Sequence, residues 1–374
     1  MWTIALKTLI ADRGKLATAL VGVVFSIVLV NVQGGLFLGF IKKAGLLADC
    51  GEADIWVGHK HMTTIDFPQD IPRRWVHRIR SLPGVKRAEP YIIGQTNMSL
   101  PSGGFELVVV VGVDRESLLG NAWNVVQGRP DAILRPDGVI IDQCDLEKLE
   151  QPKMGEVREV GGRRARIVAF SHGIKSFLVT PYVFTTHERA AAYVQKDPSF
   201  CSYYLVQLEP GASPDEVCAS IRQRVPQLDA FPRHVYSRIS ANYWLTRSGL
   251  GISFGAATLI GLFVGLVIVA QTLYSLVLDR LAEFGTLKAI GATESQVYRI
   301  LFLQATIMAL VGSLIGLALA AAIQHFFSTP VALIFVPAWL SLGSCGLVLV
   351  ICLIASLLPY LRIRKIDPVM VLQS

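Results

Sequence analysis

The sequence predicts an α-helical membrane protein with four transmembrane helices and an α+β extracytoplasmic domain inserted between the first and the second helix. The first observation is composition: the 374 residues are 52% hydrophobic and only 17% charged, whereas a soluble chain carries about 25% charged residues. The second is clustering, because four apolar runs each exceed the roughly 18 to 20 residues that a bilayer-spanning helix needs. These runs are residues 16–41, 250–278, 300–327 and 339–361.

Basic residues flank these runs unevenly, and the asymmetry predicts how the chain is oriented. By the positive-inside rule, both termini and the loop 279–299 are cytoplasmic, and residues 42–249 are outside. Lys42 and Lys43 oppose this orientation but are outnumbered. Because much of the net charge of +7 lies beside the spans, it does not indicate a nucleic-acid partner. The flanking basic residues are Lys7, Arg13, Lys15, Arg280, Lys288, Arg299, Arg362, Arg364 and Lys365.

The two ends of the chain are expected to lie on the cytoplasmic side. In residues 1–15, Trp2, Leu6 and Leu9 share one helical face, which predicts a short helix in the inner membrane interface. An extension of the first span needs the same residues and stays open as the alternative. Residues 362–374 are expected to form a cytoplasmic tail.

The outer region, residues 42–249, is large enough for a core of its own and for two subdomains. Strand-like and helical patterns alternate in residues 51–114, with a helix expected at 69–82, and again in residues 201–240. Two β-α-β units at opposite ends of an insertion predict one porter-like α/β subdomain assembled from both. Residues 115–200 alternate apolar and polar residues with many glycines, which predicts a second, β-rich subdomain inserted into the first.

Four of the six cysteines fall in the outer region: Cys50, Cys144, Cys201 and Cys218. An oxidising compartment would permit disulfides among them. Their spacing does not give a connectivity, and free buried cysteine is the favoured alternative.

Histidines and one serine raise an enzymatic alternative for the outer region. His59 and His61 alternate in an expected strand and could bind a metal together with Asp66 or His77. Alternating histidines on an exposed strand are more often plain solvent-facing residues, so no metal is expected. Ser171, in the sequence FSHG, lacks the Gly-x-Ser-x-Gly pattern of a hydrolase nucleophile.

Small and polar residues inside the spans predict close contacts between helices. Glycines four residues apart let two helix backbones approach closely, within this chain or between two copies of it. The pairs are Gly35 and Gly39, Gly261 and Gly265, and Gly312 and Gly316. Asn31 and three glutamines are expected to pair across helices. The four runs contain no Asp, Glu, Lys or Arg, which counts against an ion-coupled carrier.

The loop 279–299 combines an apolar stripe with a charge in its middle. If its first half is helical, Leu281, Phe284 and Leu287 share one face, and Glu283 projects into that face. A helix lying on lipid would keep the carboxylate away from its apolar face. The pattern therefore predicts insertion into a socket on another protein, which can supply a partner for the buried charge.

The same loop carries a resemblance to a known family. The segment RLAEFGTLKAIGAT, residues 280–293, resembles the cytoplasmic loop of ABC transporter permeases of the MacB and FtsX type. The tail RIRKIDPVMVLQ, residues 362–373, is similar to the family's terminal Asp-Pro stretch, with Met370 and Val371 in place of the usual small and apolar residues. The order of one span, a large outer domain and three further spans agrees. Within the superfamily the chain is most similar to the DevC branch, the membrane subunits of glycolipid exporters.

The resemblance implies a permease subunit with the type VII fold of ABC transporters. Its loop would be a coupling helix that docks into an ATPase. ATP-driven closure of two ATPases would move the coupling helices, and the outer domains would change shape to export a lipid, a glycolipid or another hydrophobic cargo. The residues to which the coupling role carries over are Arg280, Glu283, Phe284, Gly285, Lys288 and Gly291.

The expected assembly contains more than this chain. The sequence has no GxxxxGK[ST] phosphate loop, and only residues 1–15 precede the first span. We therefore expect a separate ATPase to hold ATP and Mg²⁺, with no enzymatic activity and no cofactor in this chain. The resemblance implies a homodimer in the lipid of a bacterial inner membrane, working with a membrane-fusion adaptor and an outer-membrane channel.

Two other branches of the family share the loop and stay open as alternatives. Permeases like LolC and LolE release lipoproteins, and permeases like FtsX activate a hydrolase outside the membrane. A neighbouring gene for an adaptor would favour export. A gene for a lipoprotein chaperone or a hydrolase would favour the alternatives.

Overall fold

The structure is a computed structural model, and it divides the chain into two compact units. The outer domain comprises Phe40–Gly249, and the helix bundle comprises residues 1–39 and 250–374. The residues that the structure describes are 13–178, 180–247, 249–278, 293–328 and 334–356.

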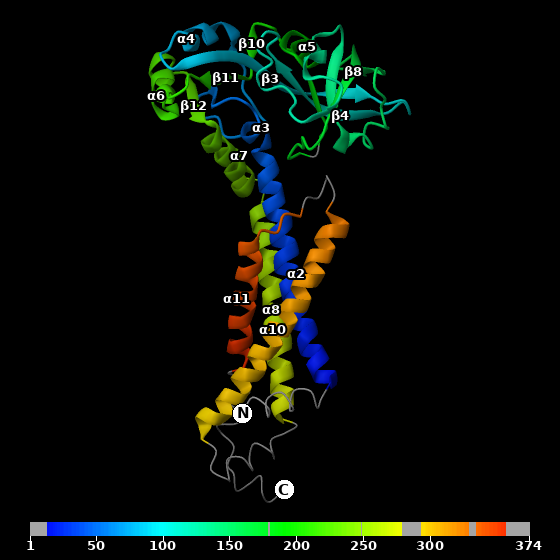
Figure 1. Ribbon diagram of the computed structural model, residues 1–374, viewed down its shortest axis with the longest axis vertical. Helices are drawn as coiled ribbons and strands as arrows, with labels where there is room; N and C mark the ends of the chain where they lie inside the picture. Colours follow the sequence, from blue (N-terminus) through cyan, green and yellow to red (C-terminus); the bar gives the residue numbers. More distant parts are fainter. Residues whose placement is uncertain (1–12, 179, 248, 279–292, 329–333, 357–374) are drawn as a thin grey trace, which may run out of the picture. The chain divides into compact units, whose positions relative to one another are not determined.

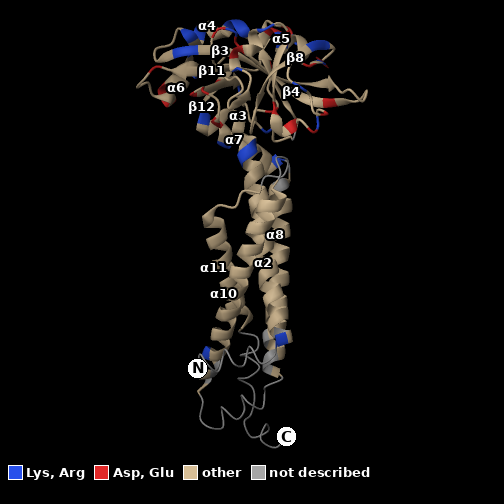
Figure 2. Cartoon of the chain, turned by 45° about the vertical axis from the view of Figure 1, so that its right-hand side comes forward, with Lys and Arg blue, Asp and Glu red and all other residues tan. Residues whose placement is uncertain are grey.

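The helix bundle consists of long apolar helices (Figure 1). They are α2 (Arg13–Ala44), whose last residues belong to the outer domain, α8 (Leu250–Leu278), α10 (Glu294–Phe327) and α11 (Ala338–Ala355). Each contains a segment long and apolar enough to cross a membrane, and Figure 2 shows these helices almost free of charged residues. The prediction of four transmembrane helices is therefore confirmed. The predicted segments 1–15, 279–299 and 339–361 extend in part, and 362–374 entirely, beyond the described residues.

All four helices contribute to one apolar core in the bundle. Val23 and Ile27 of α2 pack with Val269 of α8, Met308 of α10 and Val348 of α11. Positions three or four residues apart lie on one face of a helix, so each helix gives a narrow stripe to this core. Many of the remaining apolar side chains are exposed, as expected for helices surrounded by lipid.

The outer domain is built on a ten-stranded sheet in the order β12-β1-β11-β3-β4-β9-β6-β8-β5, with β7 paired to β3 and β8. Its strands are β1 (Ile55–His59), β3 (Val85–Ser99), β4 (Phe105–Val113), β5 (Val125–Gln127), β6 (Gly138–Asp142), β7 (Val157–Val160), β8 (Arg163–Ser171), β9 (Tyr182–Thr186), β11 (Tyr203–Leu208) and β12 (Leu228–Pro232). A separate small sheet pairs β2 (Ile71–Pro72) with β10 (Phe200–Cys201). The helical elements are α3 (Leu46–Asp49), η1 (Arg73–Trp75), α4 (Val76–Arg80), η2 (Pro130–Leu134), η3 (Gln143–Asp145), α5 (His187–Tyr193), α6 (Pro214–Arg224) and α7 (Arg233–Arg247).

The longest strand, β3, joins the two halves of the large sheet. Its first half pairs with β11 and its second half with β4, both antiparallel. The pairs β4 with β9 and β6 with β8 are parallel. Apart from β2 and β10, the strands of residues 51–114 and 201–240 therefore share one continuous sheet with the strands of residues 115–200.

Alternation along β1 shows why this part of the sheet has a core on both faces. Ile55 and Val57 belong to a core that also contains buried side chains of α4, α5 and α6. Trp56 belongs to a second core, together with Tyr236 of α7 and residues of α3. Successive side chains of a strand point to opposite faces, so helices cover both faces.

Two local expectations need correction. The segment 69–82, expected to be one helix, contains strand β2 and then η1 and α4. Pro72 explains this, because proline pushes the residue before it out of the helical region. His61 lies in the turn after β1 with a φ of 65°, so it does not share a strand face with His59.

Candidate functional site

The residues predicted to dock an ATPase lie outside the described residues, but the helix that follows them is described. Thr293 caps α10: its side chain accepts the backbone N–H of Gln296, and Gln296 Oε1 accepts the Thr293 N–H at 3.0 Å. This capping box satisfies N–H groups that the start of a helix leaves free, so it fixes where α10 begins. The predicted docking residues outside the described part are Arg280, Glu283, Phe284, Gly285, Lys288 and Gly291.

The paired glycines of α8 lie against α2. A Cβ atom on Gly261 would overlap the Leu29 side chain, and one on Gly265 would overlap Ser26 Oγ. No larger residue fits at either position unless these side chains or one of the helices move. These two glycines therefore set how closely α8 approaches α2.

The paired glycines of α10 lie against another part of α2. A Cβ atom on Gly312 would lie 2.5 Å from Val23 Cγ1, and one on Gly316 would lie 2.7 Å from Ile27 Cβ. Both distances are shorter than real Cβ contacts, so close approach again depends on the missing side chain.

The glycines of α2 itself lie in the part of the helix that ends the bundle unit. A Cβ atom on Gly35 would lie 2.9 Å from Ile334 Cγ2, and the Gly35 carbonyl accepts the Phe335 N–H at 2.9 Å. Gly39 is buried in the same helix. The segment before α11 therefore packs on the backbone of α2 at Gly35.

A polar contact links α2 to α11 inside the bundle. Asn31 is fully buried; its Nδ2 donates to Ser344 Oγ at 2.8 Å, and its Oδ1 accepts from Ser341 Oγ at 3.2 Å. The expected pairing of Asn31 across helices is confirmed. An amide in an apolar interior needs such partners, because leaving it without a hydrogen bond costs free energy.

A second polar cluster, in the outer domain, ties the end of α2 to α7. We call it the junction and define it by Ala44, Thr64, Ile65, Tyr236 and Ser240. Ser240 is fully buried in α7; its Oγ donates to the Ala44 carbonyl at 2.9 Å and accepts the Ile65 N–H at 3.3 Å. The last carbonyls of a helix have no partner within it, so Ser240 supplies one for α2 and holds the loop after β1 at the same time.

Tyrosine hydroxyls complete the junction. The Tyr236 hydroxyl lies 3.0 Å from the Thr64 carbonyl and 3.1 Å from the Tyr203 hydroxyl, which itself donates to Thr64 at 3.0 Å. Trp56 packs edge-on against Tyr203 with ring centroids 5.4 Å apart. Burial raises the pKa of both tyrosines, so their hydroxyls stay protonated and continue to donate.

The far end of α7 is held by an acid and an aromatic stack. Trp244 Nε1 donates to Asp66 Oδ2 at 2.9 Å, and the Trp244 ring stacks on Phe177 with centroids 4.2 Å apart. Burial raises the pKa of Asp66, while the bonds from Trp244 and Thr64 lower it. Together with the junction, these contacts fix α7 along the domain.

Sequence reasoning missed these residues, although α7 carries a signal. Tyr236, Ser240 and Trp244 recur at intervals of four residues, which places them on one helical face. A serine between two large aromatic residues on that face indicates a polar contact in a buried surface. Only the structure shows that its partners are Ala44 and Ile65.

The structure also describes the serine, the cysteines and the possible metal ligands that the sequence singled out. Ser171 is buried and donates to Asp142, which also accepts the backbone N–H of Ile174. All six cysteines are free thiols, of which Cys201 and Cys218 are buried in the outer domain. Among the described residues, no group of three or more His, Cys, Asp or Glu side chains is placed to hold a metal ion.

Both units of the chain match known families. Residues 16–224 match the MacB-like periplasmic core domain, and residues 255–368 match the FtsX-like permease C-terminal domain. Two relatives from strains of Mycobacterium tuberculosis, both described as uncharacterised ABC transporter permeases, are 27% identical over 358 residues. These alignments cover 93% of this chain and 91% of each relative.

Solved structures give more distant likenesses. The periplasmic region of MacB from Actinobacillus actinomycetemcomitans is 7% identical with a TM-score of 0.40, covering 50% of this chain and 92% of that chain. The extracellular domain of the ABC-type transporter YknZ from Gram-positive bacteria is 11% identical with a TM-score of 0.36, covering 48% of this chain and 98% of that chain.

The family assignment rests on the first match, which spans more than half of the chain. The second match covers residues 255–368, which include most of α8 and all of α10 and α11. The chain therefore belongs to the ABC transporter permeases of the MacB and FtsX type, a family of multi-pass membrane subunits whose membership implies an ATPase partner.

Proposed function

We propose that this permease is the membrane subunit of an exporter in which a cytoplasmic ATPase drives a change in the outer domain by mechanical transmission. The junction is the observation that carries the proposal. Ser240 binds the end of α2 and the loop after β1 from its place in α7. Motion of either helix end would therefore be passed to the loop after β1, because Ser240 is hydrogen-bonded to both.

The length of α8 supports this mechanism. Its 29 residues extend about 43 Å at 1.5 Å per residue, whereas the hydrocarbon core of a bilayer is about 30 Å thick. The excess would project from the membrane as a stalk. α7 ends only three residues before α8 begins, so the chain runs almost directly from this stalk to the junction.

The proposed input is the loop that precedes α10. Phe284 and the neighbouring apolar residues would insert into a socket on the ATPase, and Glu283 would pair there with a basic group. Arg280, Gly285, Lys288 and Gly291 would shape the docking segment. This places both termini and the loop in the cytoplasm and the outer domain on the opposite side of the membrane.

The proposed assembly is of the DevC type. Two copies of the permease would stand on two ATPase subunits, which bind ATP and Mg²⁺, and an adaptor would connect the outer domains to an outer-membrane channel. The cargo would be a lipid, a glycolipid or another hydrophobic molecule. The absence of acidic and basic residues from the four predicted apolar runs supports ATP rather than an ion gradient as the energy source.

Charge reversal in the loop tests the proposal. Glu283→Lys should abolish docking of the ATPase and export, because the buried lysine would lack an acidic partner in the socket. Glu294→Lys, which makes the same change in the first turn of α10, serves as the matched control and should leave docking intact. Co-purification of the ATPase with each variant measures the effect. Docking that survives Glu283→Lys unchanged would contradict the proposed coupling role.

The partners and cargo need a second experiment. Purification of the full chain from its native membrane, followed by mass spectrometry, should recover an ATPase, an adaptor and a bound lipid. Recovery of a lipoprotein chaperone or a hydrolase instead of an adaptor would contradict export and favour one of the two other branches of the family.

A further inference from the structure

A cavity of about 880 Å³ opens in the outer domain beside α4, away from the residues of the junction. It is lined by residues of β2, η1, α4, β3 and β10, by the segment after β4 and by the segment before β10. Its volume lies within the range of about 300 to 1,000 Å³ that is common for small-molecule sites. The charges on its walls indicate which molecules it could bind.

One wall of the cavity is basic because of helical spacing. η1 and α4 have the sequence RRWVHRIR at residues 73–80. Ile79 is fully buried in the core of the domain, which turns the opposite face of these helical turns outward. Arg74 and His77, three residues apart on that face, line the cavity together with two further arginines.

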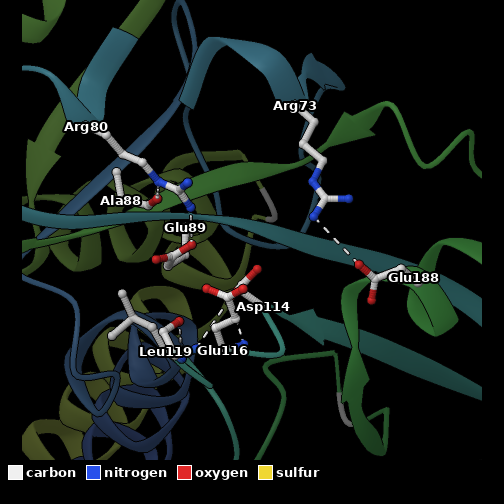
Figure 3. A network of polar contacts seen from close by, with 9 residues as sticks. Arg73, Arg80, Ala88, Glu89, Asp114, Glu116, Leu119 and Glu188 are labelled. Carbon is white, nitrogen blue, oxygen red and sulfur yellow. Dashed lines mark hydrogen bonds and ion pairs between the residues drawn. The ribbon is translucent and has the colours of Figure 1, made fainter. Parts of the chain in front are cut away.

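The two further arginines are already paired (Figure 3). Arg80 Nε donates to the Ala88 carbonyl at 2.7 Å, and its guanidinium forms an ion pair with Glu89. Arg73 points toward Glu188, at 3.6 Å. These pairs neutralise Arg73 and Arg80 within the protein.

The remaining charged groups of the cavity have no such pairing. Within the described residues, the side chains of Arg74, His77 and Glu116 form no hydrogen bond or ion pair, although all three line the cavity. Asp114 also lines it and uses Oδ2 to accept the N–H groups of Glu116 and Ser117. The cavity thus offers the unpaired guanidinium of Arg74 from η1, the imidazole of His77 from α4, and carboxylates from the segment after β4.

The pKa of the buried Glu89 responds to the carboxylates of Asp114 and Glu116, which form the acidic wall of the cavity. Burial raises its pKa, Arg80 lowers it, and the carboxylates of Asp114 and Glu116 raise it again. These carboxylates are therefore close enough to act on a neighbouring charge in a poorly solvated place, where screening by water is weak. A cationic group of a ligand would be attracted by the same field.

We propose that this cavity binds a small zwitterion, with a phosphate or carboxylate group on Arg74 and His77 and an ammonium group on Asp114 and Glu116. A guanidinium and an imidazole donate to anionic oxygens, and carboxylates accept from an ammonium. A ligand with only a negative charge would be repelled by the carboxylates of the acidic wall. A ligand with only a positive charge would be repelled by the arginine of the basic wall. Phe200, which is 38% exposed, also lines the cavity and offers an apolar surface to the carbon atoms between the two charges.

Two kinds of molecule carry this pair of groups. One is the phosphoethanolamine headgroup of a phospholipid, and the other is a free amino acid. The site does not depend on the exporter function proposed above, because binding can be measured without an ATPase or an adaptor.

Binding of defined probes to the full chain tests the site. The chain is placed in nanodiscs of phosphatidylglycerol, so that no ethanolamine headgroup competes, and titrated by calorimetry. Glycerophosphoethanolamine or 4-aminobutyrate should bind at least about tenfold more tightly than inorganic phosphate or ethanolamine, because each single charge uses one wall only. The tighter of the two zwitterions identifies the source of the ligand.

Variants on the two walls separate their contributions. Arg74→Gln should weaken the zwitterion about tenfold without weakening ethanolamine, whereas Glu116→Gln should weaken the zwitterion without weakening inorganic phosphate. Arg78→Gln is the matched control, because Arg78 is exposed in α4, which directly follows η1, and does not line the cavity. It should bind every probe like the wild type.

Three results would overturn the proposal. The first is equal affinity for the zwitterions and for the single charges. The second is an equal loss of binding in Arg78→Gln and Arg74→Gln, which would indicate a general effect of surface charge. The third is a peptide containing glutamate and lysine that binds more tightly than both zwitterions, which would make the cavity a docking surface for a protein.

Discussion

Replacing Ser240 by alanine should loosen the junction without changing the fold around it. The substitution removes one oxygen atom and leaves the Ala44 carbonyl and the Ile65 N–H without their side-chain partner. Ser240 is fully buried, so water cannot readily replace that oxygen. Leaving a buried polar group without a partner costs about 1 to 3 kcal/mol.

Hydrogen exchange measures this loss at the site itself. A free energy of about 1 to 3 kcal/mol corresponds to about 5- to 150-fold faster exchange of amides that open locally. The full chain in nanodiscs should show this increase at Ile65 and in the neighbouring residues of α7. Ser220→Ala on α6, where the hydroxyl is exposed and bonds only to its own helix, provides the control and should exchange like the wild type.

The same variant tests the mechanical role. If the junction carries motion to the sheet, Ser240→Ala should reduce the amount of cargo exported per ATP hydrolysed while the ATPase still docks. Unchanged exchange at Ile65 would refute the structural reasoning. Faster exchange with unchanged export per ATP would refute the role of the junction in transmission.

Two further predictions follow from a buried histidine and from glycine packing. Burial lowers the pKa of His187 to about 4, so between pH 6.5 and 4 the unfolded chain binds a proton there that the folded chain does not. The free energy of unfolding should therefore fall as the pH drops through this window, by up to about 3 kcal/mol. His187→Leu should remove this part of the pH dependence, as measured by denaturant titrations. An identical pH dependence in both proteins would contradict the assignment. Gly316→Leu should destabilise the bundle by about 1 to 3 kcal/mol, because its Cβ would lie 2.7 Å from Ile27 Cβ. Thermal unfolding checks this against Gly255→Leu, which has nothing within 4 Å and should unfold like the wild type; equal losses would contradict it.

The helix bundle could be predicted from sequence because each span is a local property of composition. A run of about 20 apolar residues has to be helical in a bilayer, where backbone groups find no water. Most strands of the outer domain were also predictable from local patterns, whereas β2 lies in a segment that was expected to be helical. Their order in the sheet was not predictable. The first half of β3 pairs with β11, more than 100 residues away in the chain, whereas its second half pairs with β4, the next strand in the sequence.

The junction shows the same limit at the level of single residues. In the sequence, Ser240 looks like any other polar residue of an amphipathic helix. Its role depends on its hydrogen bond to Ala44, 196 residues away in the chain, which only the structure shows. For the predicted coupling segment around Phe284, the sequence is informative and the structure is not. Its charge in an apolar stripe is visible in the sequence, but its structure lies outside the described residues, so its role stays a prediction.

The side of the membrane on which that segment lies decides whether an ATPase can reach it. Two variants of the chain each keep one reactive thiol, either the native exposed Cys50 or a cysteine introduced by Phe284→Cys, with the other cysteines replaced. Both are labelled with a membrane-impermeant maleimide in spheroplasts and in inverted membrane vesicles. The proposed machine requires labelling of Cys50 only in spheroplasts and of position 284 only in inverted vesicles; labelling of both positions from the same side would rule it out.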